Sequence, residues 1–275
     1  MQSLKTQIAT YLQSKQAEVG VALYHLENGD SLTLGNQRHY PMQSVYKLHL
    51  ALAVLHQIDK GKFSLDQKIF IKKSDLLPNT WSPLREKYPQ GEVELPLSEI
   101  IAYTVSQSDN NGCDILFRLI GGPKKAHKYI RSLGIKAVNI KTTEEEMGKA
   151  EDVQFRNWTT PWAVIEVLNS FYHKNILSKN SYDFLWKTLL ATSTCPKRLK
   201  GELPEGTQVA HKTGSSGTNP QGITAATNDV GIICLPNGKH LAIVVLVSNS
   251  KENTETNEKI IADISKMAFD AYSKP

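Results

Sequence analysis

The placement of strand patterns constrains the fold of this chain more than any other feature. Residues 19–26 read as a strand, the turn at 27–30 contains Asn-Gly, and residues 31–34 return as a second strand. Three more strands are predicted near the C-terminus, at 208–214, 230–235 and 241–247. Helical patterns dominate from 44 to 198. A single sheet must therefore be completed by both ends of the chain, with the helical part inserted between them.

We therefore predict an α/β protein of the α+β type. An antiparallel five-stranded sheet is flanked by an N-terminal and a C-terminal helix, and an all-helical lobe lies beside it. The predicted domains are a discontinuous sheet domain, residues 1–43 and 199–275, and a helical domain, residues 44–198. The cleft between two such lobes is a natural place for an active site.

Composition excludes several classes of function. The 275 residues include 32 basic and 27 acidic side chains, a net charge of +5 spread along the chain without a basic tail. Nucleic acid is therefore a poor default partner, whereas a modest positive field suits a small anionic substrate. No apolar run is long enough to cross a bilayer.

Neither cysteine nor histidine indicates a metal site. Cys113, Cys195 and Cys234 are far apart and form no C-x-x-C pair, and we expect Cys113 and Cys234 to be buried free thiols. His49 and His56 lie seven residues apart in an apolar helix, too far for one tight site. We expect neither a metal nor another cofactor.

The central helix carries the first chemical motif. Ser44 and Lys47 lie three residues apart, on one face of a helix whose residues 48–55 are almost all apolar. A lysine in a buried helix is normally paired or functional. The pattern alone is weak, because it occurs again at 248–251, where we expect a solvated loop. A helix cap with an incidental lysine and a nucleophile with its base are therefore both open at this point.

Two further motifs favour the nucleophile over the helix cap. Ser108-Asp109-Asn110 and Lys212-Thr213-Gly214 each occur once, and each taken alone would suit a turn or a strand end. Together with Ser44-x-x-Lys47, they form the trio typical of class A β-lactamases and penicillin-binding proteins.

Along nearly its whole length the chain resembles a class A serine β-lactamase. The resemblance rests on the three motifs, on their spacing, and on an acidic Ω-type loop from Thr143 to Trp158. The segments most similar to the PER/VEB-type branch are Gln43, Glu144-Glu145-Glu146-Met147, Arg198-Leu199-Lys200-Gly201 and Ala225-Ala226-Thr227-Asn228-Asp229. That branch is known for hydrolysing cephalosporins, including oxyimino ones.

The resemblance implies a role for each catalytic residue. Ser44 is the nucleophile, and either Lys47 or Glu144 acting through a water is its base. Ser108 delivers a proton to the leaving lactam nitrogen, and Lys212 polarises Ser108 and attracts the substrate carboxylate.

It also implies the binding residues. Backbone N–H groups of Ser44 and Ser215 would form the oxyanion hole. Further substrate contacts are expected from Asn110, Thr213, Gly214, Arg198 and Trp81. A guanidinium fork suits a carboxylate better than an ammonium group does.

Glu144 separates the two families that share the three motifs. A DD-peptidase or penicillin-binding protein lacks a glutamate in this loop and stays acylated, as does a β-lactam sensor domain. The choice of Glu144 over its neighbours Glu145 and Glu146 depends on its spacing from Asn110.

Three positions depart from the family pattern. Gly148 stands where most members have an amide, or a histidine in the nearest branch, that helps to hold the deacylating water. Thr142 and Asn157 replace the Arg and Asp that pin the loop ends, so we expect the loop to be held differently and to be wider or more mobile. Gln43 and Ser216 occupy the positions of a disulfide found in one carbapenemase subgroup, so carbapenem hydrolysis is not indicated.

The partners and compartment follow from the resemblance. We expect a small β-lactam substrate, a monomer, and a periplasmic or secreted location. The sequence begins without the basic and apolar regions of an export signal, so any such signal has been removed or never existed.

Overall fold

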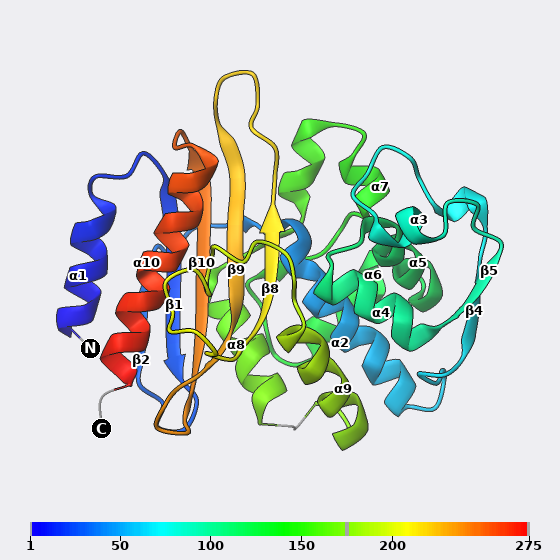
Figure 1. The fold of residues 1–275 in the computed structure, drawn as a ribbon, viewed down its shortest axis with the longest axis horizontal. Coiled ribbons are helices and arrows are strands. Elements are labelled where there is room, and N and C mark those ends of the chain that lie inside the picture. Colours follow the sequence, from blue (N-terminus) through cyan, green and yellow to red (C-terminus); the bar gives the residue numbers. More distant parts are fainter. Residues whose placement is uncertain (1, 174–175, 274–275) are drawn as a thin grey trace.

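One sheet joins the two ends of the chain in the computed structural model, which describes residues 2–173 and 176–273 (Figure 1). Its strands are antiparallel, in the order β2-β1-β10-β9-β8. They are β1 (Glu18–His25), β2 (Ser31–Leu34), β8 (Val209–Ser215), β9 (Thr224–Cys234) and β10 (His240–Ser250). The N-terminal β1 pairs with the C-terminal β10, Val21 opposite Val245. The predicted five-stranded sheet is therefore confirmed.

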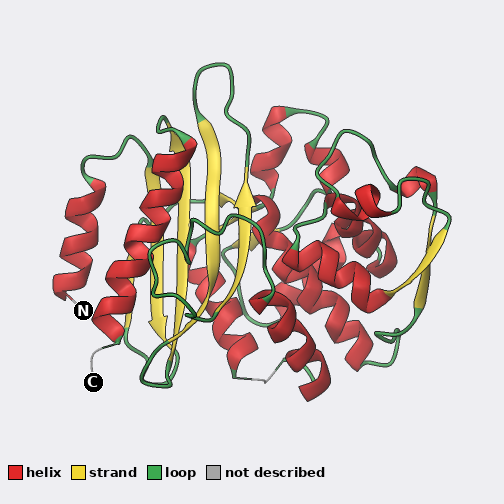
Figure 2. Ribbon diagram, in the orientation of Figure 1, coloured by secondary structure: helices red, strands yellow, loops and turns green. Residues whose placement is uncertain are grey.

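Helices cover both faces of this sheet (Figure 2). Helices α1 (Gln2–Leu12) and α10 (Thr254–Tyr272) lie on one face, where Val245 of β10 packs with Ile261. Its neighbour Val244 points to the opposite face and joins the core shared with the helical half. Helix α8 (Pro161–Tyr172) packs on that opposite face, against β1 and β10. Burial on both faces explains why β10 is an unbroken apolar run rather than an alternating one.

The helical half is built around α2 (Tyr46–Asp59), which follows a short 3₁₀ turn, η1 (Gln43–Val45). Every residue of α2 up to Leu55 is buried, as its continuous apolar sequence predicts. The other helical segments are η2 (Lys73–Asp75), α3 (Pro83–Lys87), α4 (Leu97–Ser106), α5 (Asn110–Ile120), α6 (Pro123–Ser132), α7 (Glu144–Met147), η3 (Glu151–Arg156) and α9 (Lys179–Leu190).

This half is not all-helical, because short strands that the sequence analysis did not predict lie within it. They are β4 (Lys68–Ile71) paired with β5 (Val93–Pro96), and β7 (Trp158–Thr159) between β3 (Tyr40–Pro41) and β6 (Val138–Asn139). Strand β5 ends at Pro96, and α4 begins with the next residue, Leu97. The domain boundaries at 43/44 and 198/199 stay a prediction.

Three smaller expectations can be compared with the structure. His49 is a core histidine, and burial lowers its pKa to about 4. The solvated loop predicted at 248–251 is wrong, because Ser248 and Ser250 are buried at the end of β10. The cysteines are free thiols, but only Cys113 is fully buried, whereas Cys234 is partly exposed at the end of β9.

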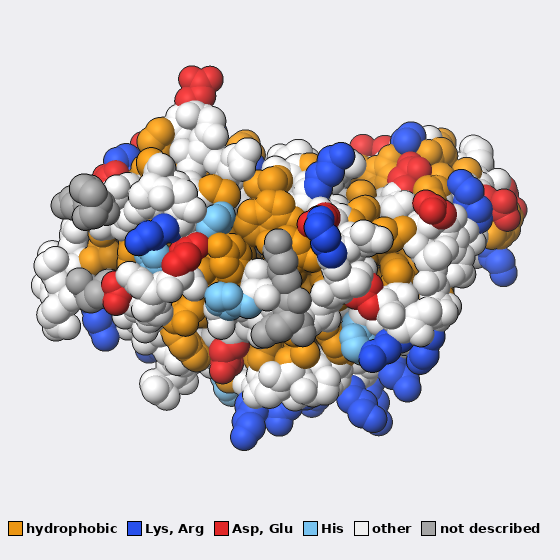
Figure 3. All heavy atoms as spheres, turned by 90° about the horizontal axis from the view of Figure 1, so that it is seen from below, with side chains coloured by type: hydrophobic (Ala, Val, Ile, Leu, Met, Phe, Trp, Pro, Cys, Tyr) orange, Lys and Arg blue, Asp and Glu red, His pale blue; other side chains and the backbone are white. Residues whose placement is uncertain are grey.

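Charge is distributed unevenly over the face seen from below (Figure 3). Lys and Arg side chains gather along one edge of that face, and acidic side chains are scattered across it. Within residues 2–173 and 176–273, none of the helices combines the length and the apolar character that a membrane span needs.

Candidate active site

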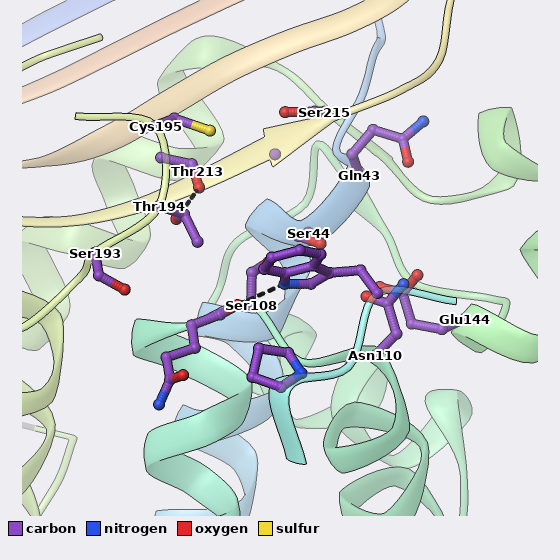
Figure 4. Close-up of a pocket in the computed structure, with 14 residues that line it drawn as sticks. Gln43, Ser44, Ser108, Asn110, Glu144, Ser193, Thr194, Cys195, Thr213 and Ser215 are labelled. Carbon is purple, nitrogen blue, oxygen red and sulfur yellow. Dashed lines mark hydrogen bonds between the residues drawn. The ribbon is translucent and has the colours of Figure 1, made fainter. Parts of the chain in front are cut away.

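A cavity of about 570 Å³ lies between β8 and the helical half (Figure 4). Its lining residues are Gln43, Ser44, Trp81, Pro83, Gln107, Ser108, Asn110, Glu144, Ser193, Thr194, Cys195, Thr213, Gly214 and Ser215. Residues from different motifs contact each other here although they are 61 to 104 residues apart along the chain. The fold therefore brings all three to one cavity.

Ser44 lies in η1, at the N-terminal end of the buried helix α2. The preceding Gln43 has a φ of +46°, and two other residues of the cavity wall, Ser108 (+59°) and Cys195 (+51°), also have left-handed backbone. Such conformations store strain and are concentrated at functional sites. Gly214 allows β8 to approach η1, because a Cβ there would lie 2.6 Å from the carbonyl oxygen of Met42.

Lys47 is fully buried and makes a network of polar contacts. Its Nζ donates to the Ser108 carbonyl oxygen at 2.8 Å and to Asn110 Oδ1 at 2.5 Å, and it lies 3.0 Å from Glu144 Oε1. An ammonium group with no water contact is tolerable in a core only when it is paired in this way. The same group joins the helix of Ser44 to the second motif and to the Ω-type loop.

Glu144 begins the short helix α7 and has its carboxylate directed at α2. Oε1 accepts a hydrogen bond from the Tyr46 hydroxyl at 2.8 Å. The backbone N–H groups of Glu144 and Glu145 donate to the two carboxylate oxygens of Asp114, each at 2.8 Å. Burial raises the pKa of Asp114 to about 6. These contacts fix Glu144 by its backbone from α5 and by its side chain from α2.

Ser108 is held in place by the next residue in the chain. Asp109 is buried, caps α5 through the N–H of Gly112, and accepts hydrogen bonds from the Leu84 N–H and the Ser82 hydroxyl. Burial is the main cause that raises the pKa of Asp109. Three donors make Asp109 a rigid support for Ser108.

Lys212 connects the sheet to the helical half. Its Nζ donates to Ser108 Oγ and to the Thr213 carbonyl oxygen, both at 2.9 Å. Burial, reinforced by the positive charge of Lys47, lowers the pKa of Lys212 to about 7. A proton can therefore be exchanged between this ammonium group and Ser108 near neutral pH.

The predicted side-chain subsite lies on the helical wall. Asn110 Nδ2 donates to Thr80 Oγ1 at 2.6 Å while its Oδ1 accepts from Lys47. The indole of Trp81 is 56% exposed at the cavity and is anchored by Nε1 to the Gln107 carbonyl oxygen. Both residues line the cavity, and their contact with substrate stays a prediction.

Arg198 lies beneath β8 and is not among the residues that line the cavity. Its guanidinium donates to the carbonyl oxygens of Gly214 and Asn228, and to Ser215 Oγ at 2.8 Å, and pairs with Glu258 at 3.3 Å. Arg198 therefore reaches the cavity through the hydroxyl of Ser215. On the cavity side, the Thr213 and Thr194 hydroxyls share a 2.6 Å hydrogen bond.

The ends of the Ω-type loop are closed by Asn157 instead of an ion pair. Asn157 Oδ1 accepts from the N–H groups of Lys141 and Thr142, and Nδ2 donates to the Thr142 carbonyl oxygen. The loop is held differently from the family pattern, as expected, while greater width or mobility stays a prediction. Gln43 donates to Gln154 Oε1 at 2.6 Å, which ties the loop to the residue before Ser44.

The sequence analysis missed several residues of the site. Tyr46 and Asp114 hold Glu144, and Ser193, Thr194 and Cys195 form one edge of the cavity. Tyr46 lies inside the Ser-x-x-Lys motif, and Asp114 follows Asn110 by one helical turn, so both could have been found by their spacing. The segment 193–195 has no sequence pattern from which a place in the site could have been predicted.

Metal ligation is not indicated by the part of the chain that the structure describes. Across residues 2–173 and 176–273, no group of three or more His, Cys, Asp or Glu side chains could hold a metal ion.

Comparisons with known proteins agree with this geometry. The profile of the beta-lactamase enzyme family matches residues 3–272. Beta-lactamase VEB-1 of Pseudomonas aeruginosa is 49% identical over 98% of this chain and 90% of its own, and extended-spectrum beta-lactamase PER-1 of the same species is 45% identical over 97% and 86%. The crystal structure of TLA-3 extended-spectrum beta-lactamase superposes with a TM-score of 0.98 at 61% identity and covers 99% of both chains. The chain belongs to the beta-lactamase enzyme family and is a class A serine β-lactamase.

Proposed function

We propose that this enzyme opens cephalosporins, including oxyimino ones, as its preferred β-lactams. VEB-1 and PER-1 share about half of its residues, and PER-1 carries the description extended-spectrum. The cavity has a volume of about 570 Å³ and an exposed Trp81 at its rim. A wide opening beside an exposed aromatic ring suits a substrate with a bulky acylamino side chain.

In the proposed acylation step, Ser44 Oγ attacks the lactam carbonyl carbon and its proton passes to the Lys47–Glu144 pair. The carbonyl oxygen becomes an oxyanion, which the backbone N–H groups of Ser44 and Ser215 stabilise. The C–N bond of the lactam then breaks, and Ser108 gives its proton to the leaving nitrogen. Lys212, 2.9 Å from Ser108 Oγ, replaces that proton, and the proton that Ser44 released to the Lys47–Glu144 pair then restores Lys212.

In the proposed deacylation step, Glu144 takes a proton from a water molecule, whose oxygen attacks the acyl-ester carbon. The ester bond to Ser44 Oγ breaks, and the proton that Glu144 took from the water passes to Ser44 Oγ, which returns both groups to their starting state. The 3.0 Å contact between Lys47 Nζ and Glu144 Oε1 is the observation that carries this proposal. It pairs a lysine one helical turn after Ser44 with a carboxylate that lines the same cavity as Ser44, which supports the proposal.

The substrate carboxylate is proposed to lie against β8. Thr213, Gly214 and Ser215 line that wall, and the charges of Lys212 and Arg198 lie behind it. Asn110 is proposed to hydrogen-bond the acylamino group, with Trp81 packing over it.

The experiment that tests these roles compares two variants with a chromogenic cephalosporin. Glu144→Gln should accumulate the acyl-enzyme, seen as a stable mass increase, with turnover lowered by ~10²–10⁴-fold. Ser44→Ala should never gain that mass. Normal steady-state hydrolysis by the glutamine variant would remove Glu144 from its role.

We also infer a monomer that acts in the periplasm or outside the cell, because the substrates of this family meet the cell from outside. Size-exclusion chromatography with light scattering tests the first inference, and fractionation of a cell that expresses the native gene tests the second. A stable dimer or a cytoplasmic enzyme would contradict them.

A further inference from the structure

The buried hydroxyl of Tyr46 is aimed at the side chain of Glu144. Tyr46 is the first residue of α2 and has no exposed surface. Its Oη donates to Glu144 Oε1 at 2.8 Å and is contacted by Cys113 Sγ at 3.6 Å, while its ring stacks on Phe117 with centroids 5.7 Å apart. Packing therefore leaves the hydroxyl little freedom to turn to another acceptor.

Two consecutive residues of α2 contact the same oxygen of Glu144. Lys47 Nζ lies 3.0 Å from Oε1, which is also the acceptor of the Tyr46 bond. Oε2 receives neither donor. Among the described residues, the two donors of α2 therefore contact Oε1 and not Oε2.

The Ω-type loop gives this carboxylate no comparable support. Asp114 binds backbone N–H groups of the loop, not the Glu144 side chain. Gly148 has no side chain, and a second cavity of about 270 Å³, lined by Gly148, Asp114 and Glu144 among others, lies behind the carboxylate. The orientation of the Glu144 side chain consequently depends on α2.

We propose that Tyr46 is a positioning residue for Glu144: its hydroxyl holds Oε1 so that Oε2 faces the acyl-ester and acts as the base of deacylation. This inference rests on the proposed role of Glu144 and adds the residue that directs it. Tyr46 itself does not line the substrate cavity. Burial raises the pKa of Tyr46 well above its usual value, so the phenol stays a hydrogen-bond donor throughout the working pH range.

Loss of this donor should change how deacylation depends on pH. The charged or titratable groups near Glu144 are Tyr46 and Lys47 of α2, Cys113 and Asp114 of α5, Lys212 of β8, and Glu145 and Glu146 of its own helix. A hydrogen bond to a carboxylate favours its charged form. Loss of the donor should therefore change the pH dependence of deacylation and leave that of acylation unchanged.

The test is the isosteric variant Tyr46→Phe, which removes one oxygen atom. Acylation and deacylation are measured separately, by stopped-flow absorbance with a chromogenic cephalosporin and by intact mass, from pH 5 to pH 9. We expect deacylation to slow by ~10-fold, acylation to change less, and acyl-enzyme to accumulate during turnover. Tyr40→Phe is the matched control, since Tyr40 is an equally buried tyrosine whose hydroxyl donates to the Gly35 carbonyl oxygen, away from the cavity. It should leave both rates and the pH profile unchanged.

Glu144→Gln, measured in parallel, distinguishes failure of this inference from failure of the proposed function. If the glutamine variant stalls as an acyl-enzyme while Tyr46→Phe keeps the deacylation rate and pH profile of the parent, only the positioning role is overturned. If the glutamine variant turns over normally, the proposed base itself is wrong. Adding Tyr46→Phe to Glu144→Gln should cause no further loss, and an additive loss would show that Tyr46 acts elsewhere.

A crystal structure of the parent enzyme provides a check that needs no variant to fold. We expect Tyr46 Oη within hydrogen-bond distance of the Glu144 carboxylate. A separation beyond 3.5 Å, with another donor on Oε1, would overturn the positioning role.

Discussion

The two walls of the cleft are built in opposite ways. The helical wall places charged side chains in the protein interior: Lys47 is fully buried and contacts Glu144, and Asn110 and Tyr46 complete the polar contacts of that pair. The sheet wall presents the edge of β8, with Gly214 and Ser215 at the cavity and Arg198 beneath them. Of its charged groups, only Lys212 crosses to the other wall.

This difference indicates that the two walls have different roles, one in proton transfer and one in substrate recognition. Interactions that shift protons belong in a dry, pre-organised environment, which the core around α2 supplies. Recognition of a carboxylate needs a positive charge and donors at a shaped edge, and we propose that β8 and Arg198 supply them. We therefore expect changes in the helical wall to alter rates and changes in the sheet wall to alter the Michaelis constant.

The largest effect should come from Lys47→Ala in the helical wall. The change removes the donor to Glu144 Oε1 and Asn110 Oδ1 and leaves a partly buried carboxylate without its cation. We expect kcat to fall by ~10²–10⁴-fold. Steady-state kinetics, with circular dichroism as the check of folding, measures this. An effect confined to KM would break the proposed division.

A smaller effect should come from Arg198→Lys in the sheet wall. Lysine cannot reproduce the four contacts of the guanidinium, with Gly214, Asn228, Ser215 and Glu258. We expect KM for a cephalosporin to rise by ~10-fold with kcat nearly unchanged. A fall in kcat with constant KM would contradict the assignment of Arg198 to recognition.

The smallest effect should be a pH dependence of KM, caused by Lys212 in the sheet wall. Burial lowers the pKa of Lys212 to about 7, so Lys212 is charged below that pH and neutral above it. Attraction of the substrate carboxylate is therefore present at pH 6 and lost by pH 8.5, and KM should rise severalfold over that interval. A cephalosporin ester, which lacks the carboxylate, is the control. An equal rise for the ester would show that another group is responsible.

Sequence patterns predicted the main helices and strands well, because these depend on the local order of apolar and polar residues and on burial. The apolar strand at 241–247, the Asn-Gly turn at 27–30 and the buried helix after Ser44 all have strong local signals, and the structure contains each. The strand β4 was not found, because two of its four residues are exposed and its partner β5 ends in a proline, which cannot donate a strand hydrogen bond.

The motifs predicted many of the side chains that line the cavity, and the resemblance implied the contact of Lys212 with Ser108, but the contacts of Tyr46, Asp114 and Arg198 were not predicted. The Tyr46–Glu144 bond joins residues 98 apart, and the Lys212–Ser108 bond joins residues 104 apart. Such contacts depend on the packed lobes and not on any local pattern. The buried position of Arg198 is of the same kind, because nothing in residues 198–201 shows that β8 will lie over it.

The most direct test of the acyl-serine account is to mix the purified enzyme with excess chromogenic cephalosporin and follow absorbance and intact protein mass together. The account predicts many turnovers per molecule and a transient mass increase on the peptide that contains Ser44, which disappears as substrate is exhausted. A single-turnover burst with a lasting adduct would contradict it, and would favour a penicillin-binding protein or a β-lactam sensor.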